Sequence, residues 1–95
     1  MILCCGEALI DMLPRETAAG ETAFLPLAGG SVFNSAIALG RLNVPTGFFS
    51  GLSSDFFGEV LRDTLARSNV DYSYSAISDR PTTLAFVRLV DGQAR

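Results

Sequence analysis

The sequence predicts an α/β fold with a parallel sheet. Apolar runs that suit buried strands alternate with segments whose apolar residues recur at helical spacing, in the order strand, helix, strand, helix. This order is typical of parallel strands joined by right-handed crossovers. The composition agrees, because 48% of the residues are hydrophobic and 18% are charged, as in globular domains.

The first strand is expected over residues 2–10, an apolar run interrupted by one glycine. We expect it to end near Asp11 and to be closed by Pro14, which cannot donate a ladder hydrogen bond. A polar stretch follows over 15–24. A short extended piece over 22–27 then looks like an excursion from the main sheet.

The first helix is expected to run to about Leu42, with Gly30 or Ser31 as its N-cap. Asn43 suits the left-handed position that follows many helices, and Pro45 prevents continuation. The small residues along this helix favour close packing on a sheet.

A second strand is expected over 46–52. Ser53, Ser54 or Asp55 then offers an N-cap for a second helix, whose apolar residues keep helical spacing to about 68–69. Together these elements complete the β-α-β-α pattern.

The last third alternates with period two and predicts strands over 72–77 and 82–90. Asp91-Gly92 is a hairpin turn signal, so a return strand should begin near Gln93 or Ala94. The sequence offers too few residues for it. We therefore expect a chain cut short.

Charge and residue types exclude several functions. The net charge is −3, and all seven basic residues are arginines, scattered singly. We therefore expect no nucleic-acid partner and no anionic membrane partner. The first apolar run lacks a basic flank, so we expect no signal peptide or membrane span and a cytoplasmic location. Without histidine or lysine, any catalytic base must be a carboxylate.

The stretch "AGGSVFN" contains Gly29, Gly30 and Asn34 at the start of the first expected helix. It lacks the lysine of a phosphate-binding P-loop and the spacing of a dinucleotide fingerprint. Two glycines let a ligand approach free N–H groups, while an asparagine offers both a donor and an acceptor. This pattern indicates a site for hydroxyl groups. A plain turn with a locally bonded asparagine explains the spacing equally well.

Asp11 favours the ligand interpretation. A carboxylate at the carboxyl end of the first strand of an open α/β sheet lies where such folds bind ligands. An ionised carboxylate only accepts hydrogen bonds, so with Asn34 it suits a ligand rich in hydroxyl donors. The alternative is a strand-end aspartate that initiates the turn to Pro14.

Three motifs resemble the amino-terminal part of the ribokinase-like, PfkB-type carbohydrate kinases: "CGEALIDM", "AGGSVFNSAIALGRL" and "SGLSSDFFGEVL". A fourth, "RPTTLAFVRLVDG", looks most like the fructokinase branch. The resemblance covers residues 1–95. It implies a three-layer α/β sandwich with a small β lid, whose core would comprise 1–13 and 28–71 and whose lid would comprise 14–27 and 72–95.

The resemblance also implies a site and a reaction. Family members transfer the γ-phosphoryl group of ATP to a sugar hydroxyl with Mg²⁺, using a glycine-rich segment that this sequence lacks. We therefore expect no catalytic residue here, ATP and Mg²⁺ sites outside these residues, and little activity from the chain alone. The residues implied to bind the sugar are Asp11, Gly29, Gly30 and Asn34, with Ala85 and Val87 as walls.

The sequence departs from the family pattern at three positions and leaves two alternatives open. Val32, Asn43 and Ser53 replace a small residue or proline and two glycines, which affects loop shape. One alternative is a sugar-acid kinase of the 2-keto-3-deoxygluconate type, with Arg88 as the cation for the acid. The other is a non-catalytic module that assembles by β pairing, since lids in this family often form homodimers.

Overall fold

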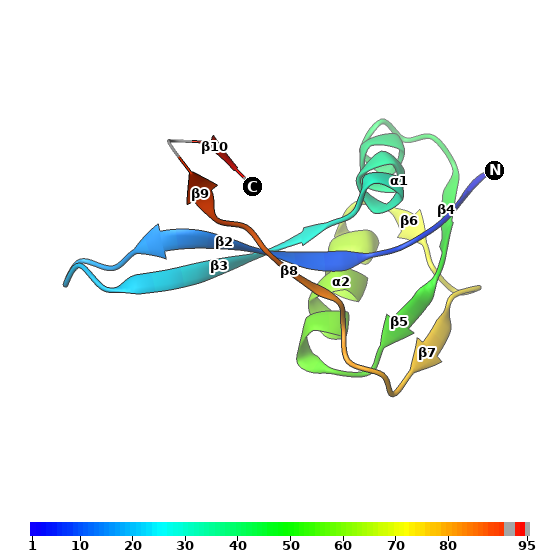
Figure 1. Cartoon of the computed structure of the whole chain (residues 1–95). Helices are drawn as coiled ribbons and strands as arrows, with labels where there is room; N and C mark the ends of the chain where they lie inside the picture. The colour runs from blue at the N-terminus through cyan, green and yellow to red at the C-terminus, as the bar shows by residue number, and fades with distance from the viewer. Residues whose placement is uncertain (91–92, 95) are drawn as a thin grey trace.

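The computed structural model describes residues 1–90 and 93–94 of the chain. Figure 1 shows helices beside short strands at one end, and a long hairpin over residues 9–29 that projects away from them. The chain measures 45 × 30 × 22 Å, and its radius of gyration is 14.7 Å. A compact domain of this length would have about 12 Å. The α/β class predicted from the sequence is confirmed, and the projecting hairpin accounts for the elongation.

The core sheet is parallel, with the order β1-β4-β6. Its strands are β1 (Ile2–Cys5), β4 (Thr46–Phe49) and β6 (Val70–Asp71). Two helices accompany it, α1 (Ser31–Arg41) and α2 (Phe56–Arg67). In the described part of the chain, neither helix has the length and apolar character needed to cross a membrane.

The hydrophobic core lies between the helices and the short strands. The rings of Phe33 on α1 and Phe48 on β4 meet edge to face, with centroids 5.6 Å apart. Burial of these apolar side chains is the main force that holds α1 and α2 against the strands. The buried hydrophobic residues are Ile10, Phe33, Ala36, Ile37, Phe48, Leu52, Leu61, Leu65 and Val70.

Both helices end as the sequence predicts. Leu42 is the C-cap of α1, and Asn43 follows it with φ 62°. Asn69 takes the same φ after Ser68, the C-cap of α2. Asparagine tolerates this left-handed conformation better than most residues, so the chain reverses at both points without glycine.

The projecting sheet has the order β3-β2-β8, and β2 is its central strand. β2 (Leu9–Glu16) pairs antiparallel with β3 (Thr22–Gly29) and parallel with β8 (Leu84–Phe86). The single strand expected over 2–10 is therefore wrong, because the chain leaves β1 after Cys5 and enters a different sheet.

The break and the extra length of β2 have physical causes. Gly6 passes so close to Val32 of α1 that a Cβ atom would lie 2.8 Å from that side chain. Pro14 was expected to close the strand, but β2 continues to Glu16. The pairing with β8 ends at Met12, so Pro14 lies in an edge region, where proline is tolerated.

The remaining strands are short and form two pairs. β5 (Gly51–Ser53) and β7 (Ala76–Ser78) are parallel. β9 (Leu89–Val90) and β10 (Gln93–Ala94) are antiparallel. A short return strand is therefore present, so the expectation that the sequence offers too few residues for it is wrong. The expected turn residues 91–92 lie outside the described residues.

The three long strands expected in these regions are wrong in extent. Residues 46–52 break into β4 and β5 at Ser50, only 76–78 of the stretch 72–77 extends as a strand, and 82–90 divides into β8 and β9. Short pairings in several small sheets replace the long strands. Period two reports local extension, and it does not show where a strand changes partners.

Candidate functional site

Asp11 lies in the middle of a three-stranded ladder. It is the third residue of β2, with Leu27 of β3 as its partner on one side and Ala85 of β8 on the other. The sequence placed Asp11 at the carboxyl end of the first strand, and this position is wrong. Directly paired residues share a face of the sheet, so the half-buried carboxylate lies between two apolar neighbours. Aspartate is uncommon in strands, so strand propensity does not explain its presence at this position.

Gly29 makes room for Asp11. A Cβ atom at Gly29 would lie 3.3 Å from Cγ of Asp11 and even closer to its Oδ2 atom. Gly29 is buried, and it ends β3 directly before the start of α1. The absence of a side chain at Gly29 therefore leaves the room that the Asp11 carboxylate occupies. The space at this glycine is filled by Asp11, whereas the sequence alone suggested an approaching ligand.

Gly30 is the N-cap of α1 and has a φ of 112°. A Cβ atom there would lie 2.7 Å from the carbonyl oxygen of Glu7, so both backbone conformation and space require glycine. Among the described residues, no side chain caps this helix start through a hydrogen bond. The first-turn N–H groups of a helix have no acceptor within the helix, and the positive end of the helix dipole lies beside them.

The predicted residues lie on β2, on or next to the neighbouring strands β3 and β8, and at the start of α1. Asp11, Gly29 and Ala85 are neighbours, and the Val87 amide donates to the Met12 carbonyl at 3.1 Å, which extends the pairing beyond β8. Asn34 is connected to this group through the helix, because its backbone N–H donates to the Gly30 carbonyl at 2.8 Å. Asn34 is exposed, so its side chain is accessible to a ligand.

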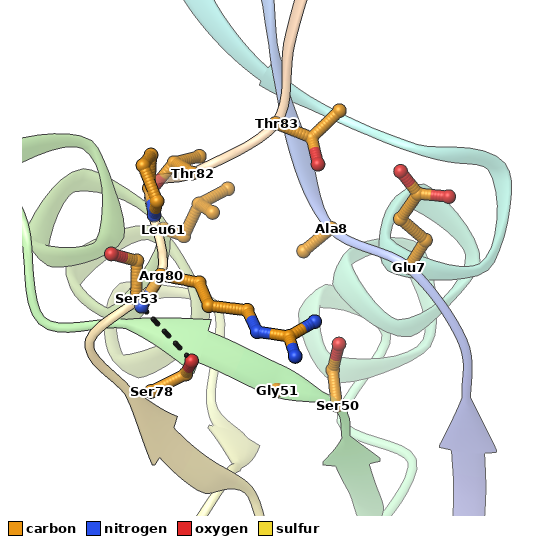
Figure 2. A pocket seen from close by; sticks show the side chains of 11 residues that line it. Glu7, Ala8, Ser50, Gly51, Ser53, Leu61, Ser78, Arg80, Thr82 and Thr83 are labelled. Carbon is orange, nitrogen blue, oxygen red and sulfur yellow. Dashed lines mark hydrogen bonds between the residues drawn. The ribbon is translucent and has the colours of Figure 1, made fainter.

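A pocket of about 400 Å³ lies beside this cluster. Figure 2 shows Glu7 on the opposite side of the pocket from Ser53 and Thr82, with the Arg80 guanidinium reaching towards Ser50. Among the described residues, the pocket is lined by Glu7, Ala8, Ser50, Gly51, Ser53, Leu61, Ser78, Arg80, Pro81, Thr82 and Thr83. It includes none of the six residues predicted to bind a ligand.

The pocket and the Asp11 cluster are adjacent but separate. They meet at the entry to β2, where the backbone of Glu7 and Ala8 packs against Gly30. We favour the Asp11 cluster as the candidate site, because it combines a carboxylate with a glycine that its position requires. The pocket offers hydroxyl groups with one carboxylate and one guanidinium, which also suit polar ligands.

Sequence reasoning missed the pocket because loops supply most of it. Glu7 follows β1, Ser50 follows β4 and Arg80 follows β7. Ligands of α/β folds bind outside the carboxyl ends of strands, so these positions could have been found had the strand ends been placed correctly. The errors in the predicted strand ends concealed the fact that these residues follow strands.

The half-buried carboxylate of Asp55 accepts three hydrogen bonds. As the N-cap of α2, it accepts from the Gly58 amide at 2.7 Å. It also accepts from the Thr82 hydroxyl at 2.6 Å and from the Thr82 amide at 2.8 Å. These bonds, led by the Thr82 hydroxyl, lower the pKa of Asp55 to about 2. The sequence predicted the cap but missed Thr82.

Across residues 1–90 and 93–94, no group of three or more His, Cys, Asp or Glu side chains is arranged to hold a metal ion. The Mg²⁺ implied by the resemblance therefore has no such group of ligands among these described residues.

Comparison with known proteins identifies relatives over the whole chain. The model of the family described as "pfkB family carbohydrate kinase" matches residues 1–95. A fructokinase from Rhizobium leguminosarum bv. trifolii is 66% identical over 94 residues, covering 99% of this chain and 29% of that protein.

Solved structures agree. The crystal structure of fructokinase from Xylella fastidiosa has a TM-score of 0.89 and 40% identity, covering 99% of this chain and 30% of that one. The same enzyme with bound ATP has a TM-score of 0.83 and 42% identity, covering 90% of this chain and 28% of that one. The chain therefore spans about a third or less of the length of the relatives it matches.

Proposed function

The chain belongs to the pfkB family of carbohydrate kinases, and we propose that it forms the part of a fructokinase that binds the acceptor sugar. The observation that carries the proposal is the carboxylate of Asp11, held over Gly29 between two other strands. A fructokinase-like chain needs to orient several hydroxyl groups, and an ionised carboxylate accepts hydrogen bonds from them.

In this proposal the residues position the sugar without reacting with it. Asp11 accepts hydrogen bonds from two sugar hydroxyls, Asn34 both donates and accepts, and the uncapped start of α1 donates from its backbone. Ala85 and Val87 form an apolar wall on the β8 side. Holding the reacting hydroxyl in one orientation removes much of the entropic barrier to its reaction.

The phosphate donor is proposed to be ATP, as in the Xylella fastidiosa structure that contains it. Bound ATP supplies the γ-phosphoryl group, and Mg²⁺ neutralises charge on it. We assign both sites to the part of the kinase outside these residues. The same proposal includes a lid formed by 14–27 and 72–95 over a core of 1–13 and 28–71, and a cytoplasmic location.

A fusion tests the proposal. Residues 1–95 would replace the matching 29% of the Rhizobium leguminosarum fructokinase; we call this protein the fusion kinase. We expect fructose phosphorylation within about tenfold of the parent kcat/KM, or about 1.4 kcal/mol in barrier. A fusion kinase that does not fold, or that folds without fructose activity, would contradict the proposed role.

Substitution of Asp11 tests the assigned residue. We expect Asp11→Ala in the fusion kinase to lower kcat/KM for fructose by about a hundredfold or more, because sugar positioning is lost. Asp63→Ala is the matched control, since Asp63 is an exposed carboxylate on α2. Equal sugar kinetics in both variants would remove Asp11 from the site.

The sugar-acid kinase remains the alternative within the same family. It needs a cation for the acid, and Arg88 is exposed between β8 and β9. Turnover of 2-keto-3-deoxygluconate by the fusion kinase, in preference to fructose, would favour it. The fructokinases among the relatives support fructose.

A second candidate function is assembly through the projecting sheet. The rings of Phe24 and Phe86 meet edge to face with their centroids 5.2 Å apart, yet the two residues remain 43% and 61% exposed. Apolar side chains exposed together on a sheet favour a protein partner, and a second copy of the lid would form a homodimer. Light scattering of the fusion kinase at several concentrations tests this, and a strict monomer would exclude it.

A further inference from the structure

We infer that Asp55 is a positioning residue for the proposed sugar site around Asp11, and that it acts through Thr82, which lies two residues before strand β8, the strand that pairs with β2 at Asp11. The inference rests on the proposed function, because it assigns a kinetic role to a contact outside the sugar site. Asp55 is far from Asp11 in the sequence and lies at the start of α2.

The contact fixes Thr82 by two hydrogen bonds to one carboxylate. The Thr82 amide donates to Oδ2 of Asp55 at 2.8 Å, and its hydroxyl donates to Oδ1 at 2.6 Å. Two bonds to a charged acceptor set the orientation of Thr82 as well as its position. We call this contact the Asp55 latch.

The latch acts where the chain leaves the helices for the projecting sheet. Strand β7, which ends at Ser78, pairs with β5. The Ser54 amide also donates to the Ser78 carbonyl at 2.8 Å. From Leu84 onward the chain pairs with β2. Thr82 lies between these two pairings, so its fixation sets the direction in which β8 departs.

A short path leads from the latch to Asp11. Directly after Thr82, the Thr83 carbonyl accepts from the Ile10 amide at 3.0 Å. Ile10 then pairs with Leu84, and Asp11 pairs with Ala85. A shift of Thr82 therefore changes the alignment of β8 against the strand that carries the carboxylate.

One substitution separates the latch from the helix cap. Asparagine is as good an N-cap as aspartate, so Asp55→Asn keeps an acceptor for the Gly58 amide. Its NH₂ group cannot accept from the Thr82 amide, because both groups are donors. Thr82→Val removes the hydroxyl at nearly the same volume, and Thr82→Ser keeps it.

Kinetics of the fusion kinase test the inference. For Asp55→Asn and Thr82→Val, we expect the KM for fructose to rise about tenfold, while kcat and the KM for ATP stay within about twofold. Thr82→Ser should restore the fructose KM, and Asp63→Asn on the same helix should leave all three constants unchanged. An unchanged fructose KM in a folded Asp55→Asn variant would overturn the inference. A fall in kcat together with a rise in the KM for fructose and in the KM for ATP would show that Asp55 has only a general structural role.

Hydrogen exchange gives a readout that does not need activity. We expect the Ile10 and Val87 amides, whose hydrogen bonds join β2 to the residues on either side of β8, to exchange about tenfold faster in Asp55→Asn, with amides in the middle of α2 unchanged. If the parent fusion kinase does not phosphorylate fructose, the proposed function fails. The exchange rates then decide whether the latch aligns β8, and equal rates in both proteins reject it.

Discussion

The two helices begin in opposite ways. α1 starts at Gly30, whose φ of 112° admits almost no other residue and which provides no side-chain cap. α2 starts at Asp55, whose carboxylate accepts from the Gly58 amide and from Thr82. Every helix start leaves N–H donors without partners. At α2 the protein satisfies one of them with its own carboxylate, whereas at α1 no side chain of the described residues forms a capping hydrogen bond.

The largest effect is expected from adding a methyl group at the open helix start. Gly30→Ala combines a left-handed backbone with a Cβ atom 2.7 Å from the Glu7 carbonyl oxygen. It should lower the free energy of unfolding of the fusion kinase by about 2–4 kcal/mol. Denaturant unfolding measures this change.

Gly51→Ala is the matched control for that substitution. A Cβ atom at Gly51 would have no other atom within 4 Å among the described residues. We expect a change within about 0.5 kcal/mol. Equal losses at Gly30 and Gly51 would show that the start of α1 is not sterically special.

A smaller effect is expected from opening the sealed start. Asp55→Ala should lower the free energy of unfolding by about 1–2 kcal/mol, because the Gly58 amide and Thr82 lose their acceptor. Ser31→Ala, at the first position of α1, should change it by less than about 0.5 kcal/mol. Thermal unfolding of both variants checks this difference, and a larger loss at Ser31 would contradict the comparison.

The smallest effect concerns pH. The hydrogen bonds from Thr82 lower the pKa of Asp55 from 3.8 to about 2. A lowered pKa means that the folded state favours the ionised form, so this stabilisation is complete above pH 4 and is lost as pH falls towards 2. After solvent screening it amounts to about 1 kcal/mol or less. Asp55→Asn should therefore unfold with a shallower pH dependence between pH 4 and 2, and identical slopes would exclude this origin.

The helices were predictable from the sequence because their signals are local. Asp55 as a cap and Asn43 in the left-handed conformation each depend on neighbours within a few residues. The strands were less predictable because their partners are distant. The apolar run at the amino terminus gave no sign that residues on either side of Gly6 enter different sheets.

The candidate site was predicted by residue type more than by geometry. Asp11, Gly29 and Gly30 were chosen for their chemistry, and the structure brings them close to one another. The reason for glycine at position 29 was missed, because only the fold reveals that the Asp11 carboxylate occupies the space that a Cβ atom of residue 29 would need. Thr82 was missed because it meets Asp55 across 27 positions of the chain, a distance at which spacing carries no signal.

The ladder around Asp11 also imposes an order of folding. Leu27 reaches Asp11 through a local hairpin, which closes in about 1–10 μs. Ala85 comes from the far end of the chain, and at a synthesis rate of 5–20 residues per second it is made about 4–15 s after Asp11. One side of the carboxylate is therefore in place long before the other exists. During synthesis, β8 therefore adds to a hairpin whose residues have already been made.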